Sequence, residues 1–183
     1  MMTRRPERLL SSAIFAAALI AATPFGAAAE SDDSAFFRQV AGKWSGHGKI
    51  VEGKMKGTRF RCKLDGLPIE GEHQGFKLDG KCRAGLFSHP MTAVFIREDD
   101  GYRGHFLDGE DGDGLAVTGG SVEDGRAVIA LRRKDVEGAL VTSLVGAEDL
   151  DITLLIKGGT RYVPVIGLSL KRQTDPLSVG AVK

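Results

Sequence analysis

The sequence predicts an all-β fold, an antiparallel meander of about eight to ten strands that closes into a barrel. Apolar and polar residues alternate with a period of two over most of the chain, which is typical of strands with one buried face. Asp-Gly and Gly-Gly pairs interrupt this alternation at short intervals and favour hairpin turns. Long stretches with helical periodicity are missing after the first thirty residues.

The first twenty-nine residues predict a secretory signal peptide. Arg4 and Arg5 precede an apolar run over 9–22, and Ala27-Ala28-Ala29 has the small side chains of a cleavage site. The run is shorter than the roughly 20 apolar residues that a membrane-spanning helix needs. We therefore expect Sec-type export with cleavage after Ala29, a periplasmic or secreted protein, and no transmembrane span in the mature chain.

Cleavage would leave residues 30–183, with 22 basic and 23 acidic side chains and a net charge of −1. This length fits a single domain with a sizeable core. We expect one barrel domain over 30–172 and a flexible tail over 173–183. The near-neutral charge predicts no general attraction to nucleic acid. The oligomeric state stays open.

The element order begins with one short helix over 34–40, for which Ser34 is the expected N-cap. Alternating segments separated by turns rich in Gly and Asp then predict the strands. These strands cover residues 42–52, 58–65, 74–83, 91–98, 102–108, 115–122, 126–133, 140–145, 151–157 and 161–171.

Cys62 and Cys82 are the only cysteines, and in an exported protein they most simply pair with each other. The alternation places Cys62 on the same face as Phe60, and Cys82 on the same face as Phe76. Both faces are apolar and belong to strands that follow each other in the sequence. This is the geometry that a disulfide between neighbouring strands requires.

The segment Gly42-Lys43-Trp44-Ser45-Gly46-His47-Gly48 opens the first expected strand. This G-x-W-x-G-x-G pattern resembles the opening of the calycins, which are the lipocalins and their relatives, and of nitrobindin-type barrels in particular. The resemblance implies a lipocalin-like barrel in which Trp44 packs across a closed end. The chain is also similar to uncharacterised exported alphaproteobacterial proteins with the same opening and a cysteine pair on the next two strands.

Nitrobindin-type proteins bind haem through a histidine late in the barrel, and the resemblance raises that possibility here. This chain has no histidine after His105. His47 and His105 both alternate away from the apolar face, so we expect them on the outside. We therefore expect no haem and no other cofactor.

Charge is distributed unevenly along the chain. Residues 38–83 carry eleven basic and five acidic side chains, whereas residues 98–151 carry five basic and fourteen acidic ones. Six cations fall on the outward faces of the second and third expected strands and predict a basic surface patch: Arg59, Arg61, Lys63, Lys77, Lys81 and Arg83. Such a patch suits anionic head groups or an acidic protein surface. A plain solvated strand face is the alternative.

The segment Asp108–Gly114 combines four acidic residues with three glycines. An EF-hand loop needs oxygen ligands at its first, third and fifth positions and glycine at its sixth. Counted from Asp108, the sixth position is Asp113, so the spacing fails. We expect a solvated hairpin loop and no metal site, and a weak calcium site stays open as the alternative.

The leading functional hypothesis is a barrel that binds a small apolar or lipidic ligand in its interior. The candidate ligand-binding residues are inward aromatic side chains: Trp44, Phe60, Tyr102, Phe106 and Tyr162. One alternative is a protein-interaction module, such as a protease inhibitor that uses a protruding segment over 30–35. Another is an envelope-surface protein whose basic patch contacts anionic lipid. No nucleophile elbow, Walker loop or metal-spaced His/Glu pair occurs, so we expect no enzyme.

Overall fold

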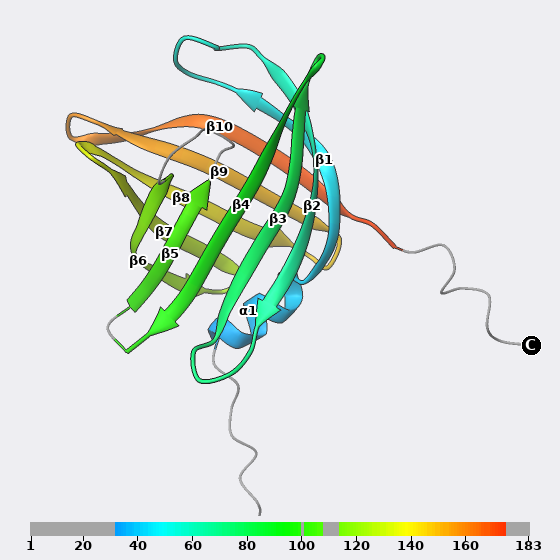
Figure 1. The fold of residues 1–183 in the computed structure, drawn as a ribbon, viewed down its shortest axis with the longest axis vertical. Coiled ribbons are helices and arrows are strands. Elements are labelled where there is room, and N and C mark those ends of the chain that lie inside the picture. Colours follow the sequence, from blue (N-terminus) through cyan, green and yellow to red (C-terminus); the bar gives the residue numbers. More distant parts are fainter. Residues whose placement is uncertain (1–31, 100, 108–113, 175–183) are drawn as a thin grey trace, which may run out of the picture.

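The chain forms a closed barrel of ten antiparallel strands with one short helix at one end (Figure 1). The computed structural model describes residues 32–99, 101–107 and 114–174. Each strand pairs with the next one along the chain, and the first pairs with the last, which confirms the predicted fold class. The elements are α1 (Asp32–Val40), β1 (Gly42–Ile50), β2 (Arg59–Ile69), β3 (Gly75–Ala84), β4 (Phe87–Glu98), β5 (Gly101–Leu107), β6 (Leu115–Glu123), β7 (Arg126–Arg133), β8 (Val136–Val145), β9 (Asp149–Gly158) and β10 (Arg161–Arg172).

Two expected boundaries are wrong in an informative way. Strand β4 begins at Phe87, four residues before the predicted start, because Pro90 was taken as a break. Along that stretch β4 pairs with β3, with Pro90 opposite Lys81, and within the described residues its pairing with β5 is seen from Thr92 onward. The β3–β4 ladder thus continues through the proline. Helix α1 begins at Asp32, so Ser34 lies inside the helix and hydrogen-bonds Gln74 rather than capping it.

Helix α1 closes one end of the barrel, below β2 and β3 in Figure 1. Its Phe37 ring stacks on Phe76 of β3, with centroids 6.2 Å apart. Trp44 is 1% exposed, and its Nε1 donates a hydrogen bond of 2.9 Å to the Val40 carbonyl oxygen. Trp44 thus plugs this end of the barrel, as the family resemblance implied.

Arg172 at the end of β10 ties the last strand to this plug. Its guanidinium carbon lies 4.3 Å from the centroid of the Trp44 ring, a cation–π contact. The same side chain donates hydrogen bonds to the carbonyl oxygens of Gln39, Ala41 and Ala147. One residue therefore joins β10 to the C-terminal end of α1 and to the β8–β9 turn, and helps to close the barrel.

The opposite end, which we call the open end, holds the β1–β2 connection over 51–58 and the turns over 85–86, 134–135 and 159–160. The β1–β2 connection and the β3–β4 hairpin extend farthest at this end (Figure 1). Among the described residues, no helix is long and apolar enough to cross a bilayer.

Cys62 and Cys82 form the predicted disulfide. They lie directly opposite each other in the β2–β3 register, with Cα atoms 4.1 Å apart. Both side chains point into the barrel, where Cys62 is fully buried. The alternation of apolar and polar residues was therefore sufficient to place both sulfur atoms on the same face.

Replacing both cysteines by alanine should lower the free energy of unfolding by about 3 kcal/mol, because the cross-link no longer restricts the unfolded chain. Urea unfolding of the wild type and of the double variant Cys62→Ala/Cys82→Ala measures this difference. Dithiothreitol should bring the wild type close to the double variant and leave the variant unchanged. Equal stability of the oxidised wild type and the variant would contradict the prediction.

Tyr102 has the one buried side-chain polar atom without a hydrogen-bond partner in the described part of the chain, its hydroxyl oxygen. The ring packs edge-on against Phe37 of α1, with centroids 6.3 Å apart. Burial raises the pKa of Tyr102 above 10, and the nearby positive charge of Arg97 opposes this with a smaller effect. Burial thus favours the neutral phenol, but no described residue forms a hydrogen bond with its hydroxyl.

Tyr102→Phe should raise the free energy of unfolding by about 1 kcal/mol, because it removes an unsatisfied buried hydroxyl. The raised pKa adds a pH dependence. Above pH 10 the unfolded tyrosine loses its proton while the folded one keeps it, so the wild type loses stability as pH rises. The variant lacks this loss, so the gap between the two proteins should widen in urea unfolding above pH 10. A gap that stays constant with pH would refute the assignment.

Candidate functional site

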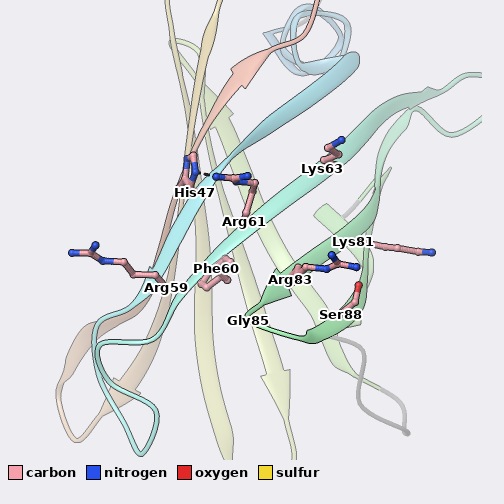
Figure 2. A pocket seen from close by; sticks show the side chains of 9 residues that line it. All are labelled: His47, Arg59, Phe60, Arg61, Lys63, Lys81, Arg83, Gly85 and Ser88. Atoms are coloured by element: carbon pink, nitrogen blue, oxygen red, sulfur yellow. Dashed lines mark hydrogen bonds between the residues drawn. The ribbon is translucent and has the colours of Figure 1, made fainter.

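A surface hollow of about 630 Å³ lies beside the open end, on the outer face of β2 and β3 (Figure 2). We call it the basic hollow, and its lining residues are His47, Arg59, Phe60, Arg61, Lys63, Lys81, Arg83, Gly85 and Ser88. Its volume falls within the roughly 300–1,000 Å³ of small-molecule sites, although it is open to solvent. It is the strongest candidate site in the structure.

The strand register explains why positive charge gathers here. Three like-charged pairs lie directly opposite each other across neighbouring strands: Lys49 with Arg59, Arg61 with Arg83, and Lys63 with Lys81. Like charges in this arrangement repel and destabilise a sheet. An anion bound between these strands would remove the repulsion, so the arrangement favours anion binding.

The described residues supply no acidic partner to the cations of the hollow. Within the described ranges, no carboxylate oxygen lies within 4.0 Å of the charged nitrogens of Arg59, Arg61, Lys63, Lys81 or Arg83. Some lysines elsewhere on the barrel do have a carboxylate partner, Lys171 among them. Lys171 Nζ lies 2.6 Å from Asp149 Oδ1 on the neighbouring strand, and this hydrogen bond raises the pKa of Lys171. The hollow therefore presents charge that is free to bind a ligand.

Arg61 is held by a histidine instead of a carboxylate. Its Nε donates a hydrogen bond of 3.0 Å to Nε2 of His47, the residue opposite it on β1. Figure 2 shows the Arg61 side chain turned toward His47, whereas Arg83 extends toward Ser88. The two opposed arginines thus point apart and leave room between them.

The predicted basic surface patch is only partly brought together. Five of its six cations line the basic hollow. Lys77 does not, because it lies farther along β3, where its Nζ is 3.7 Å from Asp79 Oδ1. The hollow also contains Gly85, in the β3–β4 turn, and Ser88, in the first rungs of β4, and neither lies in a strand predicted from the sequence.

A second, smaller space lies inside the barrel. It measures about 60 Å³, and its lining is entirely apolar: Phe60, Leu64, Leu78, Met91, Ala93, Phe106, Leu140, Ile152, Leu154, Ile166 and Leu168. An engineered cavity of ~150 Å³ in another protein holds only benzene. The interior as it stands is therefore too small for a drug-sized molecule. Three of its lining residues, Phe60, Met91 and Ile166, are only partly buried.

Phe60 separates these two spaces, since it lines both of them. Pairing between β2 and β3 ends at Arg61 and Arg83, so Phe60 has a strand neighbour only on the β1 side. That neighbour is Gly48, where an added Cβ would lie 2.2 Å from Cζ of Phe60. The glycine leaves the space that the ring occupies. In Figure 2 the ring lies between the β1–β2 strands and the β3–β4 hairpin.

The five predicted ligand-binding residues separate into three groups. Phe60 and Phe106 line the interior cavity. Trp44 and Tyr102 are buried close to α1, at the closed end. Tyr162 is 51% exposed, so its expected inward orientation is wrong. A β-bulge between Pro164 and Ile166 shifts the register, and every residue before it changes face.

Two other predictions concern a calcium-binding loop and a cleaved signal peptide. Residues 108–113 of the suggested calcium loop lie outside the described residues, as does the expected signal peptide. Within the described part, no group of three or more His, Cys, Asp or Glu side chains is arranged to hold a metal ion.

Comparisons with known proteins identify the fold. No protein-family model and no curated protein sequence matches this chain. The S-type phycobiliprotein lyase CPES from Guillardia theta matches in structure at 12% identity, with a TM-score of 0.53, over 78% of this chain and 92% of the lyase. Rv2717c from M. tuberculosis matches at 11% identity, with a TM-score of 0.45, over 79% of this chain and 99% of that one.

The likeness to the lyase supports the ten-stranded antiparallel barrel, and the calycin, lipocalin-like resemblance remains a prediction. At this level of identity the likeness to the lyase shows the fold alone. The nitrobindin-type opening and the similarity to alphaproteobacterial proteins remain predictions. The expectation that the chain is not an enzyme is wrong as an exclusion, because the matched barrel is that of a lyase. Lacking a catalytic motif is thus no argument against activity in a barrel of this fold.

Lys81→Gln should stabilise the protein at low salt by about 0.5 kcal/mol, because it removes one side of the Lys63–Lys81 repulsion. Lys171→Gln is the matched control, since Lys171 faces Asp149 and should lose stability slightly. Urea unfolding in low and high salt measures both. High salt should abolish both differences, because screening weakens repulsion and attraction alike. Destabilisation by Lys81→Gln would show that this lysine has a favourable partner.

Proposed function

We propose that the protein binds a small amphiphile with an anionic head group. The head group lies in the basic hollow, and the apolar chain passes Phe60 into the barrel interior. The observation that carries this proposal is the double position of Phe60, one ring that lines both a cationic hollow and an apolar cavity. A ligand that suits both spaces needs a negative charge at one end and a hydrocarbon chain at the other.

The charges of the hollow support the anionic head group. Arg61 and Arg83 lie opposite each other and have no carboxylate partner in the described part of the chain. Guanidinium groups bind carboxylates and phosphates through paired, charge-assisted hydrogen bonds. A carboxylate or phosphate between them would replace repulsion by two attractive contacts. Lys63 and Lys81 would add positive charge at the next opposed pair of the same ladder.

The surroundings of Phe60 support the apolar chain. The interior holds no polar lining, and its present volume of about 60 Å³ accepts no more than the end of a chain. Because Phe60 lacks a neighbour on β3, its ring has no β3 rung beside it that would restrict movement toward the hollow, while its pairing with Gly48 of β1 is kept. Movement of Phe60, Met91 and Ile166, which are partly buried, would enlarge the cavity at the side that faces the hollow.

The disulfide fits a protein exported from the cytoplasm, and we extend the proposal to a periplasmic or secreted binding protein. Protease inhibition finds less support. Residues 32–35 of the proposed inhibitory segment belong to α1, and Asp33 there is buried in an ion pair with Arg97 of β4. This stretch seals the barrel instead of protruding from it.

Dodecanoate and dodecyl phosphate should bind the wild type, and Arg61→Gln/Arg83→Gln should weaken both at least tenfold, equivalent to about 1.4 kcal/mol. Isothermal titration calorimetry measures the affinities. Lys171→Gln is the control and should bind like the wild type, because Lys171 lies outside the hollow. Uncharged dodecanol should bind weakly to all three proteins. Equal binding of dodecanoate to the wild type and the double variant would rule out the head-group site.

Ala93→Leu tests the position of the chain. Ala93 is 2% exposed and lines the interior cavity, so a leucine there would fill the space that the hydrocarbon needs. The variant should lose dodecanoate binding while acetate, which has no chain, binds as weakly as it does to the wild type. Unchanged dodecanoate affinity in a folded Ala93→Leu protein would place the chain outside the barrel.

A further inference from the structure

Large apolar side chains are exposed at the two hairpin tips beside the basic hollow. Leu86 is 97% exposed and Phe87 is 73% exposed, both at the β3–β4 turn, and Met55 is 60% exposed in the β1–β2 connection. We call these three residues the apolar tips. Both hairpins extend beyond the rest of the open end (Figure 1).

The exposed apolar residues of the described chain are concentrated at this end. They comprise nine large side chains, and six of them lie on or beside the open-end turns: Met55, Leu86, Phe87, Val136, Tyr162 and Val163. Scattered exposed apolar residues are normal, whereas a concentration of them marks an interaction surface. The open end is therefore the face on which a partner would sit.

The charge around the tips indicates which partner fits. Arg83 precedes the Leu86–Phe87 turn, Arg59 follows the β1–β2 connection, and Lys54 lies exposed next to Met55. Acidic residues also occur at the described open-end turns, but Glu52 is paired with Lys56 and Asp135 follows Lys134, whereas the closed-end turns carry Asp99, Glu123, Asp124 and Glu148. Apolar side chains flanked by cations suit the interface of an anionic bilayer. A second copy of the chain would bring the same cations against each other.

We propose that the open end docks on an anionic lipid bilayer, with the apolar tips inserted at the level of the head groups. The proposal rests on the proposed function and names the source of the ligand. The amphiphile is a membrane lipid or its product, and it enters between β2 and β3, where Phe60 closes the gap. The basic hollow lies between the two docking hairpins, so a head group at the bilayer surface reaches it directly.

Vesicle binding tests the docking surface. The wild type should sediment with phosphatidylglycerol vesicles, bind phosphatidylcholine vesicles at least tenfold more weakly, and lose binding as salt increases. Leu86→Ser/Phe87→Ser should reduce binding to phosphatidylglycerol vesicles at least tenfold. Val145→Ser is the matched control, because Val145 is 58% exposed and lies toward the closed end. Equal loss in both variants, or none in either, would overturn the proposal.

A tryptophan reporter tests insertion and orientation. Phe87→Trp should shift its emission to shorter wavelength with phosphatidylglycerol vesicles, and Val145→Trp should not. Trp44 is buried in every variant and adds a constant background. Equal shifts at the two positions would overturn the orientation. Light scattering without lipid gives the oligomeric state, and a dimer that Leu86→Ser/Phe87→Ser dissociates would assign the tips to self-association and overturn membrane docking.

Two variants separate this proposal from the proposed function. Leu86→Ser/Phe87→Ser should still bind free dodecanoate, because neither residue lines the interior cavity. Ala93→Leu should still bind vesicles, because Ala93 is buried away from the tips. Dodecanoate binding without vesicle binding in the wild type would overturn docking alone. Vesicle binding without dodecanoate binding would overturn the proposed function and support only a membrane contact.

Discussion

The pairing of β2 with β3 is the constraint on which the candidate site depends. On the inner face, the disulfide joins Cys62 to Cys82 directly across the two strands. On the outer face, the neighbouring rungs of the same ladder oppose Arg61 to Arg83 and Lys63 to Lys81. The covalent bond thus lies between two repelling pairs and holds together the strands that they push apart. One residue beyond Arg61 the strands separate, and Phe60 occupies the gap. A cross-link at this rung allows the fold to display unneutralised positive charge without losing the sheet.

Residue alternation was sufficient to predict most of the barrel, because a period of two is a local property of each strand. It placed ten strands in the right order and both cysteines on the inner face, although β2, β4 and β8 each extend four residues beyond the predicted bounds at one end. It failed where a strand departs from strict alternation. The bulge between Pro164 and Ile166 exposes Tyr162, and a bulge leaves no reliable mark in a single sequence. Pro90 hid the first rungs of β4, since proline usually interrupts a strand, whereas here β4 pairs with β3 on both sides of it.

The site itself was harder to predict, because it depends on where pairing stops rather than on which residues alternate. Phe60 reads as one more inward aromatic residue of β2, and its importance comes from the missing neighbour on β3. The space for its ring depends on Gly48, a contact across strands that only the register shows. The interior volume could not be predicted from the sequence either, because it depends on how large side chains from nearly every strand pack together. The candidate site is therefore centred on the hollow outside the barrel and not on the interior alone.

The two ends of the barrel differ in a way that favours entrance from the side. At the closed end, Trp44, α1 and Arg172 form a seal of hydrogen bonds, a cation–π contact and stacked rings. A ligand entering there would have to break all of these contacts. Between β2 and β3 near the open end, the described residues place one partly buried ring, Phe60, whose backbone lacks a partner on one side. Under the proposed function, displacing that ring would join the cationic hollow to the apolar interior. An amphiphile would fill both spaces, so its arrival would stabilise the opened barrel.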